Sequence, residues 1–532
     1  MQSQPLLVTS LIDHAAREHG TREIVTRWAD GGTARTTWGE VGRDARRFAA
    51  AMVRLGMAKG DRIATLAMNH AHHLVSWYGT AGMGGVLHTV NPRLFDEQLV
   101  YIINHAEDRV LLFDAAFLPI VERLRDQLST VEHFILFDAP ARGGYLSYSD
   151  LIGAEDDSFQ WVELDERDPV GLCYTSGTTG NPKGVLYEHR SNVIHAMSEI
   201  QPDAFAMSSR SVILPIVPMF HANSWGIPFA AATVGAKMVF SATNDAQVLC
   251  DLMHAEGVTH SAGVPTVWLA MFTHMDATGA GYGALQHVTI GGSAAPRAMI
   301  ERFMKAGVFV GHAWGMTETS PIGTMGKRPW NWDEMSFDEQ VDVICRQGCP
   351  PFGVELRIVD DEGHVLPRDG QTSGRLQCRG PWIIQRYFKA DADAADADGW
   401  FDTGDVSVIH PDGVMQITDR AKDVIKSGGE WISSIELENA AVGAPGVQEA
   451  AAVGVFHPKW DERPILLIVK KPDAEVGEAD ILDYLKDKVA KWWLPDEILF
   501  VDELPHTATG KILKRQLRDD YKDYRLKALE GA

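Results

Sequence analysis

The chain has 532 residues, of which 45% are hydrophobic and 23% charged, a composition typical of globular proteins that excludes a disordered or fibrous chain. Its 49 basic and 72 acidic side chains give a formal net charge of −23, and so acidic a surface repels nucleic acid and anionic lipid. The sequence shows neither a signal peptide nor a long apolar span, and its five cysteines are scattered, so we expect a cytoplasmic protein with no integral membrane association and no nucleic-acid partner.

Helix-like and strand-like patterns alternate along the first 170 residues. Ser10 is placed to cap a first helix, residues 61–68 and 109–113 read as buried strands, and residues 95–105 read as a helix between them. Strands are also predicted at residues 212–215, 237–240 and 287–290, each followed by a helix-like segment. This alternation predicts a large α/β body of several sheets covered by helices.

Beyond about residue 350 the pattern changes to short β-rich units. Strands are predicted at residues 354–359, 374–379, 447–456 and 463–470, and a helix at residues 479–491. The fold class we predict is therefore α/β, with a large N-terminal body followed by a small C-terminal α+β domain.

Two biased tracts invite a metal-binding interpretation. The alternating carboxylates of residues 389–398 resemble a calcium loop, but Asp396 and Asp402 stand where an EF-hand needs glycine and glutamate, so we expect a solvated loop. Residues 69–73 contain three histidines, but no second cluster has ligand spacing, so we expect a helix entry there.

Residues 174–185, with the sequence YTSGTTGNPKGV, carry the strongest chemical signal. Four serine or threonine hydroxyls, three glycines and one lysine can surround a polyphosphate with hydroxyl donors, backbone N–H groups and a cation. Composition alone leaves a glycine-rich surface loop as an equal alternative. The Walker pattern is absent, because proline precedes Lys183 and glycine follows it.

Four further segments carry polar chemistry at intervals along the chain. Residues 314–320 (WGMTETS) place an aromatic ring beside hydroxyls and a carboxylate, which suits a base and a magnesium ion. Residues 399–405 place a carboxylate after a tight turn, which suits a pair of sugar hydroxyls. Residues 419–430 and 505–515 follow, and the last of these contains a lysine after a Thr-Gly turn.

Together, in this order, the five segments resemble the signature of the acyl-adenylate-forming enzymes, a superfamily of acyl-CoA synthetases, adenylation domains and luciferase. Residues 217–226 (VPMFHANSWG) are similar to the medium- and long-chain fatty acyl-CoA synthetases, a subgroup that includes 3-methylmercaptopropionate-CoA ligases. The resemblance implies an ATP-dependent acyl-CoA ligase that forms an acyl-AMP with release of pyrophosphate and then transfers the acyl group to coenzyme A. It also implies Mg²⁺ as the cofactor.

The resemblance assigns roles residue by residue. Lys511 matches the catalytic lysine that bridges the carboxylate and the α-phosphate, and Thr175 and Glu318 match catalytic and magnesium-binding positions. The positions that match ATP- or AMP-binding residues are Thr175, Ser176, Gly177, Thr178, Thr179, Lys183, Ala294, Ala295, Pro296, Trp314, Gly315, Met316, Thr317, Glu318, Asp405, Arg420 and Lys511.

The same resemblance divides the chain into residues 1–421, an adenylate-forming domain, and residues 422–532, a mobile domain that carries Lys511. Lys422 matches the hinge about which the small domain rotates between adenylation and thioester formation. The residues that match the lining of the coenzyme A channel are Ser427, Gly428, Gly429 and Glu430.

His221, Trp225, Gly291 and Gly292 match the acyl pocket. Amino-acid-activating relatives have an aspartate where His221 stands, so α-amino acids are disfavoured. We expect a short- or medium-chain fatty or alkylthio acid, such as 3-methylmercaptopropionate, and a homodimer like many of the fatty-acid subgroup. The alternatives are an aryl- or long-chain acid, a luciferase-like monooxygenase, and a nucleotide-binding regulator without catalysis. The last is disfavoured because both Lys511 and Glu318 are present.

Overall fold

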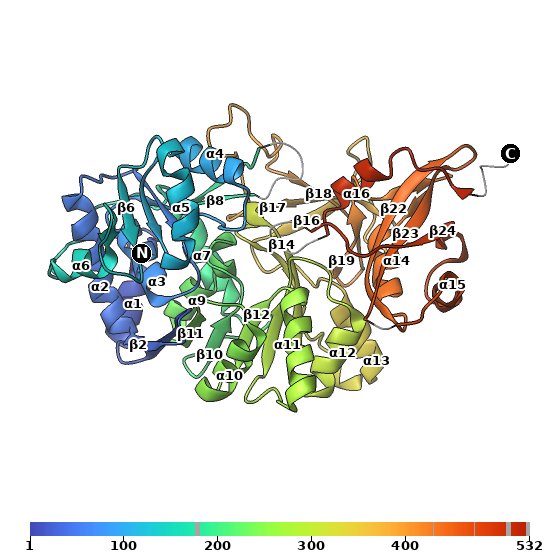
Figure 1. Cartoon of the computed structure of the whole chain (residues 1–532), viewed down its shortest axis with the longest axis horizontal. Coiled ribbons are helices and arrows are strands. Elements are labelled where there is room, and N and C mark those ends of the chain that lie inside the picture. The colour runs from blue at the N-terminus through green and yellow to red at the C-terminus, as the bar shows by residue number, and fades with distance from the viewer. Residues whose placement is uncertain (176–180, 429, 473, 507–511, 528–532) are drawn as a thin grey trace.

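The computed structural model describes residues 1–175, 181–428, 430–472, 474–506 and 512–527. Within these ranges the chain forms a large α/β body of several sheets and a small C-terminal α+β domain, as the sequence predicts. The C-terminal elements lie at one end of the long axis and the first sheet lies at the other (Figure 1). No helix in the described ranges has the length and apolar character that a membrane crossing requires.

A mostly parallel sheet, with seven strands in the described residues, forms the first lobe in the order β7-β6-β5-β3-β4-β8-β9. Its strands are β3 (Arg62–Leu66), β4 (Val86–Thr89), β5 (Asp108–Phe113), β6 (His133–Leu136), β7 (Leu146–Ser147), β8 (Pro169–Tyr174) and β9 (Gly184–Glu188). Its helices are α2 (Trp38–Arg54), α3 (Ala71–Gly82), α4 (Asp96–Ala106), α5 (Leu118–Leu124) and α6 (Tyr148–Gly153). Helices α4 and α5 bury their apolar residues on one face of the sheet, and α2 and α3 on the other.

A second sheet, with eight strands in the described residues, follows the order β15-β14-β13-β12-β10-β11-β1-β2. Its strands are β1 (Glu23–Arg27), β2 (Thr33–Thr37), β10 (Val212–Pro215), β11 (Lys237–Ser241), β12 (His260–Gly263), β13 (His287–Ile290), β14 (Phe309–Gly315) and β15 (Ile322–Met325). One face is covered by α10 (Ala246–Glu256), α11 (Pro265–Thr278), α12 (Arg297–Lys305) and α13 (Phe337–Cys345). The other face shares one continuous core with the first sheet through α1 (Val8–Glu18), α7 (His189–Glu199) and α9 (Ile227–Val234).

An antiparallel meander ends the large body. It consists of β16 (Glu355–Val359), β17 (Gly374–Arg379), β18 (Phe401–Ile409) and β19 (Met415–Arg420). Its apolar residues pack against β8 and β9 of the first sheet and against Trp314 of the second. The meander therefore holds the ends of both sheets together.

The C-terminal part has apolar cores of its own, which contain only residues 437–526. Its strands are β20 (Ile425–Ser427), β21 (Glu430–Ile432), β22 (Val447–His457), β23 (Asp461–Lys470) and β24 (Glu497–Phe500), and its helices are α14 (Ser434–Val442), α15 (Glu478–Leu485) and α16 (Lys514–Asp520). Asp419 at the end of the meander accepts hydrogen bonds from the Ser434 backbone N–H at 2.6 Å and from the Ser434 hydroxyl at 2.9 Å. These bonds join the first turn of α14 to the large body.

The strands predicted from hydrophobic pattern match the structure within one or two residues at each end. The prediction that Ser10 caps the first helix is wrong. Helix α1 begins at Val8 with Leu7 as its N-cap residue, and the Ser10 hydroxyl donates to the Leu7 carbonyl from inside the helix. The predicted helix at residues 479–491 is also too long, since α15 ends at Leu485.

The two biased tracts have structural explanations among the described residues. His70 is the N-cap of α3, and its side chain accepts a hydrogen bond from the His73 backbone N–H. Burial lowers the pKa of His72 and of His73 to about 4, which keeps both rings neutral inside the first lobe. Residues 389–398 form a mostly exposed loop, as predicted.

Candidate functional site

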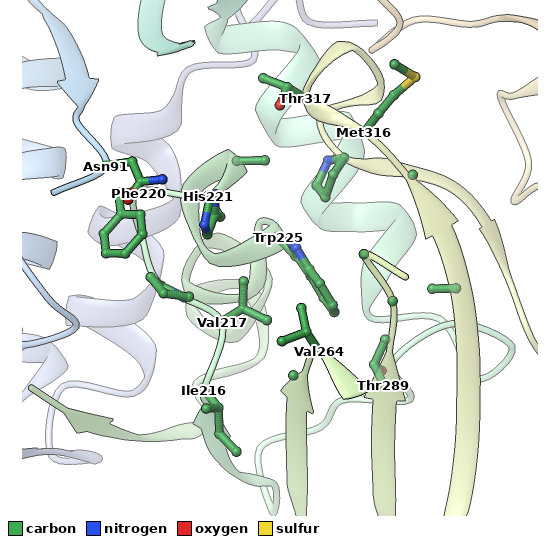
Figure 2. Close-up of a pocket in the computed structure, with 18 of the residues that line it drawn as sticks. Asn91, Ile216, Val217, Phe220, His221, Trp225, Val264, Thr289, Met316 and Thr317 are labelled. Atoms are coloured by element: carbon green, nitrogen blue, oxygen red, sulfur yellow. The ribbon is translucent and has the colours of Figure 1, made fainter. Parts of the chain in front are cut away.

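A cavity of about 180 Å³ opens at the carboxyl ends of β10, β12, β13 and β14. Ligands of α/β sheets bind at this edge, where the loops after parallel strands converge. The cavity is lined by the predicted acyl residues and by some of the predicted ATP- or AMP-binding residues, namely His221, Trp225, Gly291, Gly292, Trp314, Gly315, Met316 and Thr317 (Figure 2). Of the predicted adenine neighbours, Trp314 lines it and Ala294, Ala295 and Pro296 do not. The fold thus brings together residues that are up to 96 positions apart in the sequence.

Trp225 is held in the cavity by an unusual stretch of backbone. All residues from Ala222 to Gly226 have positive φ, between 40° and 80°, which is a left-handed turn that costs side-chain-bearing residues about 1–2 kcal/mol each. Hydrogen bonds hold the turn: the Trp77 indole N–H donates to the Asn223 side chain at 3.2 Å, and the Ser224 hydroxyl donates to the Val217 carbonyl at 2.7 Å.

Glycines make room for the indole of Trp225. A β-carbon built on Gly291 would lie 3.3 Å from Cη2 of Trp225, and one on Gly292 would lie 3.9 Å from Cζ2. Behind the turn, a β-carbon on Gly226 would lie 2.8 Å from the buried side chains of His195 and Glu199. The left-handed turn and these glycines together fix where the indole stands.

Glu318 lies on a short 3₁₀ turn (Thr317–Thr319), and only 6% of its surface is exposed. Burial raises the pKa of Glu318, while a hydrogen bond from the Tyr387 hydroxyl to Oε1 at 2.8 Å and the charges of Arg420 and Lys183 oppose that rise. Carboxylate and hydroxyl oxygens are the donors that Mg²⁺ prefers, so Glu318 and Thr175 fit the predicted metal.

Thr175 directly follows β8 and Lys183 directly precedes β9, and the two residues face each other across the base of the glycine-rich loop. The Thr175 backbone N–H donates to the Lys183 carbonyl at 2.9 Å, and the Lys183 backbone N–H donates to Oγ1 of Thr175 at 3.3 Å. The ammonium of Lys183 lies 4.8 Å from the centre of the Tyr387 ring. This places the cation near Glu318, whereas the predicted residues Ser176, Gly177, Thr178 and Thr179 lie outside the described ranges.

Asp405 and Arg420 are directly opposite each other on β18 and β19. Nε of Arg420 lies 2.7 Å from Oδ1 of Asp405, and the Trp314 indole N–H donates to Oδ2 at 2.8 Å. A β-carbon on Gly323 would lie 2.1 Å from the Trp314 indole, so only glycine leaves room for this ring. Arg420 and Trp314 therefore orient the carboxylate of Asp405, which is a predicted ribose-binding residue.

The segment after β13 carries the other predicted adenine residues. The Ala295 backbone N–H donates to Nε2 of His312 at 3.2 Å, and burial lowers the pKa of His312 to about 4, so the ring is a neutral acceptor. Pro296 is the residue before α12, and Ala294 lies between Pro296 and the cavity-lining Gly292. This hydrogen bond holds the loop near the cavity-lining Gly292.

The predicted hinge and coenzyme A residues lie apart from the cavity. Lys422 is exposed in the turn between β19 and β20, Ser427 is buried, and Gly428 has φ of 62° and contacts Trp460. Glu430 begins β21, while Gly429 and Lys511 are outside the described residues. Among the described residues none from 422 onward lines the cavity, so the roles of this group stay predictions.

Several residues of the site were not predicted. Tyr387 contacts both Glu318 and Lys183, and Asn91, Asn244 and Thr289 line the cavity. None of them lies in a segment with a recognisable chemical pattern. The fold alone brings them to the site. A separate exposed group of Asp360, Glu362 and His364, between β16 and β17, has side chains close enough to hold a cation, but it lies on a surface turn.

Comparison with known proteins agrees with this geometry. Residues 12–388 match the model of the AMP-binding enzyme family, and residues 436–511 match that of the AMP-binding enzyme C-terminal domain. The chain is 50% identical to the 3-methylmercaptopropionyl-CoA ligase of Ruegeria lacuscaerulensis, over 98% of each chain. It is 48% identical to the medium-chain-fatty-acid–CoA ligase of Ectopseudomonas oleovorans, over 99% of this chain and 98% of that one.

Solved structures show the same architecture. The crystal structure of an anthranilate CoA ligase in complex with anthranoyl-AMP superposes with a TM-score of 0.87 at 25% identity, over 98% of each chain. A fatty acyl CoA synthetase of Mycobacterium tuberculosis gives a TM-score of 0.72 at 26% identity, over 97% of this chain and 99% of that one. The chain therefore belongs to the AMP-binding enzyme family and is an AMP-forming acid–thiol ligase, an acyl-CoA synthetase.

Proposed function

We propose that this acyl-CoA synthetase activates a medium-chain fatty acid or a short alkylthio acid such as 3-methylmercaptopropionate. The observation that carries the proposal is a cavity in which the predicted acyl residues, around Trp225, meet predicted ATP- or AMP-binding residues, around Trp314. The relatives at 50% and 48% identity act on acids of these two kinds by name. A methylthio end and an alkyl end have similar size and polarity, so one apolar pocket accepts both.

In the first half-reaction a carboxylate oxygen of the acid attacks the α-phosphorus of ATP, and pyrophosphate leaves. Lys511 would hold the carboxylate and the α-phosphate together and offset the negative charge that develops between them. Lys183 and the hydroxyls of the glycine-rich loop would hold the β- and γ-phosphates. Glu318 and Thr175 would hold Mg²⁺, which supplies positive charge that stabilises the departing pyrophosphate.

The pair of Asp405 and Arg420 would fix the ribose. A carboxylate can accept hydrogen bonds from two neighbouring hydroxyls, and the Trp314 N–H and the Arg420 guanidinium orient this one. The indole of Trp314 would at the same time border the adenine. The nucleotide is thus bound by residues from β14, β18 and β19.

In the second half-reaction the thiol sulfur of coenzyme A attacks the acyl carbonyl, and AMP leaves with its electron pair. We propose that residues 422–532 rotate about Lys422 between the two steps, so that Ser427, Gly428, Gly429 and Glu430 line the path of the pantetheine arm. The exposed position of Lys422 between β19 and β20, and the separate apolar cores of the C-terminal part, support such a hinge.

The test is formation of acyl-AMP and of the coenzyme A thioester across straight-chain acids from four to twelve carbons, 3-methylmercaptopropionate and benzoate. We expect the highest kcat/KM for a medium-chain acid or for 3-methylmercaptopropionate, with pyrophosphate and AMP released in equal amounts. A clear preference for benzoate, or absence of thioester with every acid despite ATP binding, would overturn the proposal.

A further inference from the structure

One face of β13 leads from the active-site cavity into the body of the sheet. His287, Thr289 and Gly291 are alternate residues, so they point to the same face, spaced by about 7 Å at roughly 3.3 Å of rise per residue. Gly291 lies beneath the indole of Trp225, and Thr289 lines the same cavity further along the strand (Figure 2). Thr289 therefore lies at the inner end of the acyl pocket.

Two polar atoms on this face lack a hydrogen-bond partner. Oγ1 of Thr289 and Nε2 of His287 are both buried, and neither bonds to any described residue. Thr289 has 0% and His287 has 7% of its surface exposed. Nearly all buried polar atoms in proteins are hydrogen-bonded, so these two atoms are available to bond a polar group that enters from the acyl pocket.

The unpartnered atoms surround a position that has no side chain. Gly311 on β14 pairs with Thr289 in the register of the sheet. A β-carbon on Gly311 would lie 3.6 Å from Oγ1 of Thr289, 3.2 Å from Nε2 of His287 and 3.2 Å from Sδ of Met325. Thr289 and Met325 both line the cavity, so this space beside Gly311 adjoins the acyl pocket.

The electrostatics of this space favour a neutral polar group. Burial lowers the pKa of His287 to about 3, so its ring is uncharged at neutral pH. A neutral imidazole and a threonine hydroxyl can each donate or accept one hydrogen bond, which matches a hydroxyl group. A second carboxylate would have to lose its hydration in this buried space, which is unfavourable even with Arg328 near the ring of His287.

We propose that the inner end of the acyl pocket recognises a hydroxyl group on the tail of the acid, and that Thr289 determines this specificity. This inference rests on the proposed function, because it places the acid in the pocket beneath Trp225. It makes ω-hydroxy acids substrates of the enzyme, bound with the tail hydroxyl between Thr289 and His287 in the space that Gly311 leaves.

The experiment compares acids that differ only in the tail group. 6-Hydroxyhexanoate and heptanoate have equal numbers of non-hydrogen atoms, and matched pairs from 4-hydroxybutanoate and pentanoate to 8-hydroxyoctanoate and nonanoate cover other lengths. We expect kcat/KM for the hydroxy acid of at least one pair to equal or exceed that of its methyl-ended partner. Thr289→Val should lower the ratio of hydroxy to methyl acid by roughly tenfold, the size of one hydrogen bond.

Two further variants separate recognition from folding. Thr289→Ser keeps the hydroxyl and should keep the ratio, whereas Thr80→Val removes another buried and unpartnered hydroxyl that lies on α3, outside the cavity, and should leave the ratio unchanged. If every hydroxy acid is strongly rejected by the native enzyme, or if Thr289→Val changes both acids of a pair equally, the inference is wrong. If heptanoate is still turned over in the same assay, the inference is wrong but the proposed function still stands.

Discussion

Replacing Tyr387 by phenylalanine removes the hydroxyl that donates to Glu318 and keeps the ring beside Lys183. The hydroxyl lies 2.8 Å from Oε1 of a carboxylate that is 6% exposed, so solvent replaces this bond poorly. Burial raises the pKa of Glu318, and the Tyr387 hydrogen bond favours its ionised form. Loss of the hydroxyl therefore raises the pKa of Glu318 further.

The predicted consequence is a loss of adenylation that depends on pH. A hydrogen bond to a charged acceptor contributes about 1.5 kcal/mol or more, which corresponds to roughly tenfold in the population of the ionised carboxylate. If only the ionised form of Glu318 holds Mg²⁺, Tyr387→Phe should react about tenfold more slowly on the acid side of the pH profile. The rate should recover as the pH rises through the new pKa.

The assay is pyrophosphate release at saturating ATP and acid, measured from acid to mildly alkaline pH. Tyr187→Phe is the matched control, because the Tyr187 hydroxyl donates to the Thr317 carbonyl at 2.9 Å in the same loop without touching the Glu318 carboxylate. The control should keep the native pH profile. A Tyr387→Phe enzyme that is slowed equally at every pH would refute the reasoning, since its defect would then not be protonation of Glu318.

Three other predictions concern the nucleotide site and the C-terminal part. Trp314→Phe removes the donor to Asp405, so the KM for ATP should rise about tenfold with a smaller change in kcat, and an unchanged KM in ATP saturation curves would contradict this role. Lys511→Ala should slow adenylation by about 10²–10³, measured by single-turnover pyrophosphate release, while added acyl-AMP should still give thioester. Lys422→Pro should spare pyrophosphate release and block thioester formation, and equal loss of both activities would argue against the hinge.

Much of the proposed nucleotide site could be assigned from the sequence because its residues form short contiguous patterns. The segment from Trp314 to Glu318, and the lysine at the end of the glycine-rich loop, owe their chemistry to neighbours in sequence. Neighbouring strands could also be predicted, since β10, β13 and β17 are bounded runs of apolar or alternating residues. The strands that carry these segments, β8, β9 and β14, are not among the predicted ones.

The remaining features depend on contacts that no local pattern contains. Tyr387 reaches Glu318 across 69 positions of sequence, and Thr289 enters the pocket only through the register of β13 with β14. The left-handed turn at residues 222–226 is stabilised by Trp77, which lies on a helix of the other lobe, so residues 222–226 alone give no reason to predict it. Ser10 is not the cap because α1 begins at Val8, with Leu7 as its N-cap, three residues earlier than a cap at Ser10 would place it.

The last two residues of β19 point to opposite faces of the meander, as neighbours on a strand must. Arg420 forms an ion pair with Asp405. The carboxylate of Asp419 accepts hydrogen bonds from Ser434 in the first turn of α14. A nucleotide whose ribose bonds to Asp405, as proposed, would thus act next to the anchor of the C-terminal part. If residues 422–532 rotate as proposed, this strand end is where the binding of ATP would favour one orientation of that part over another.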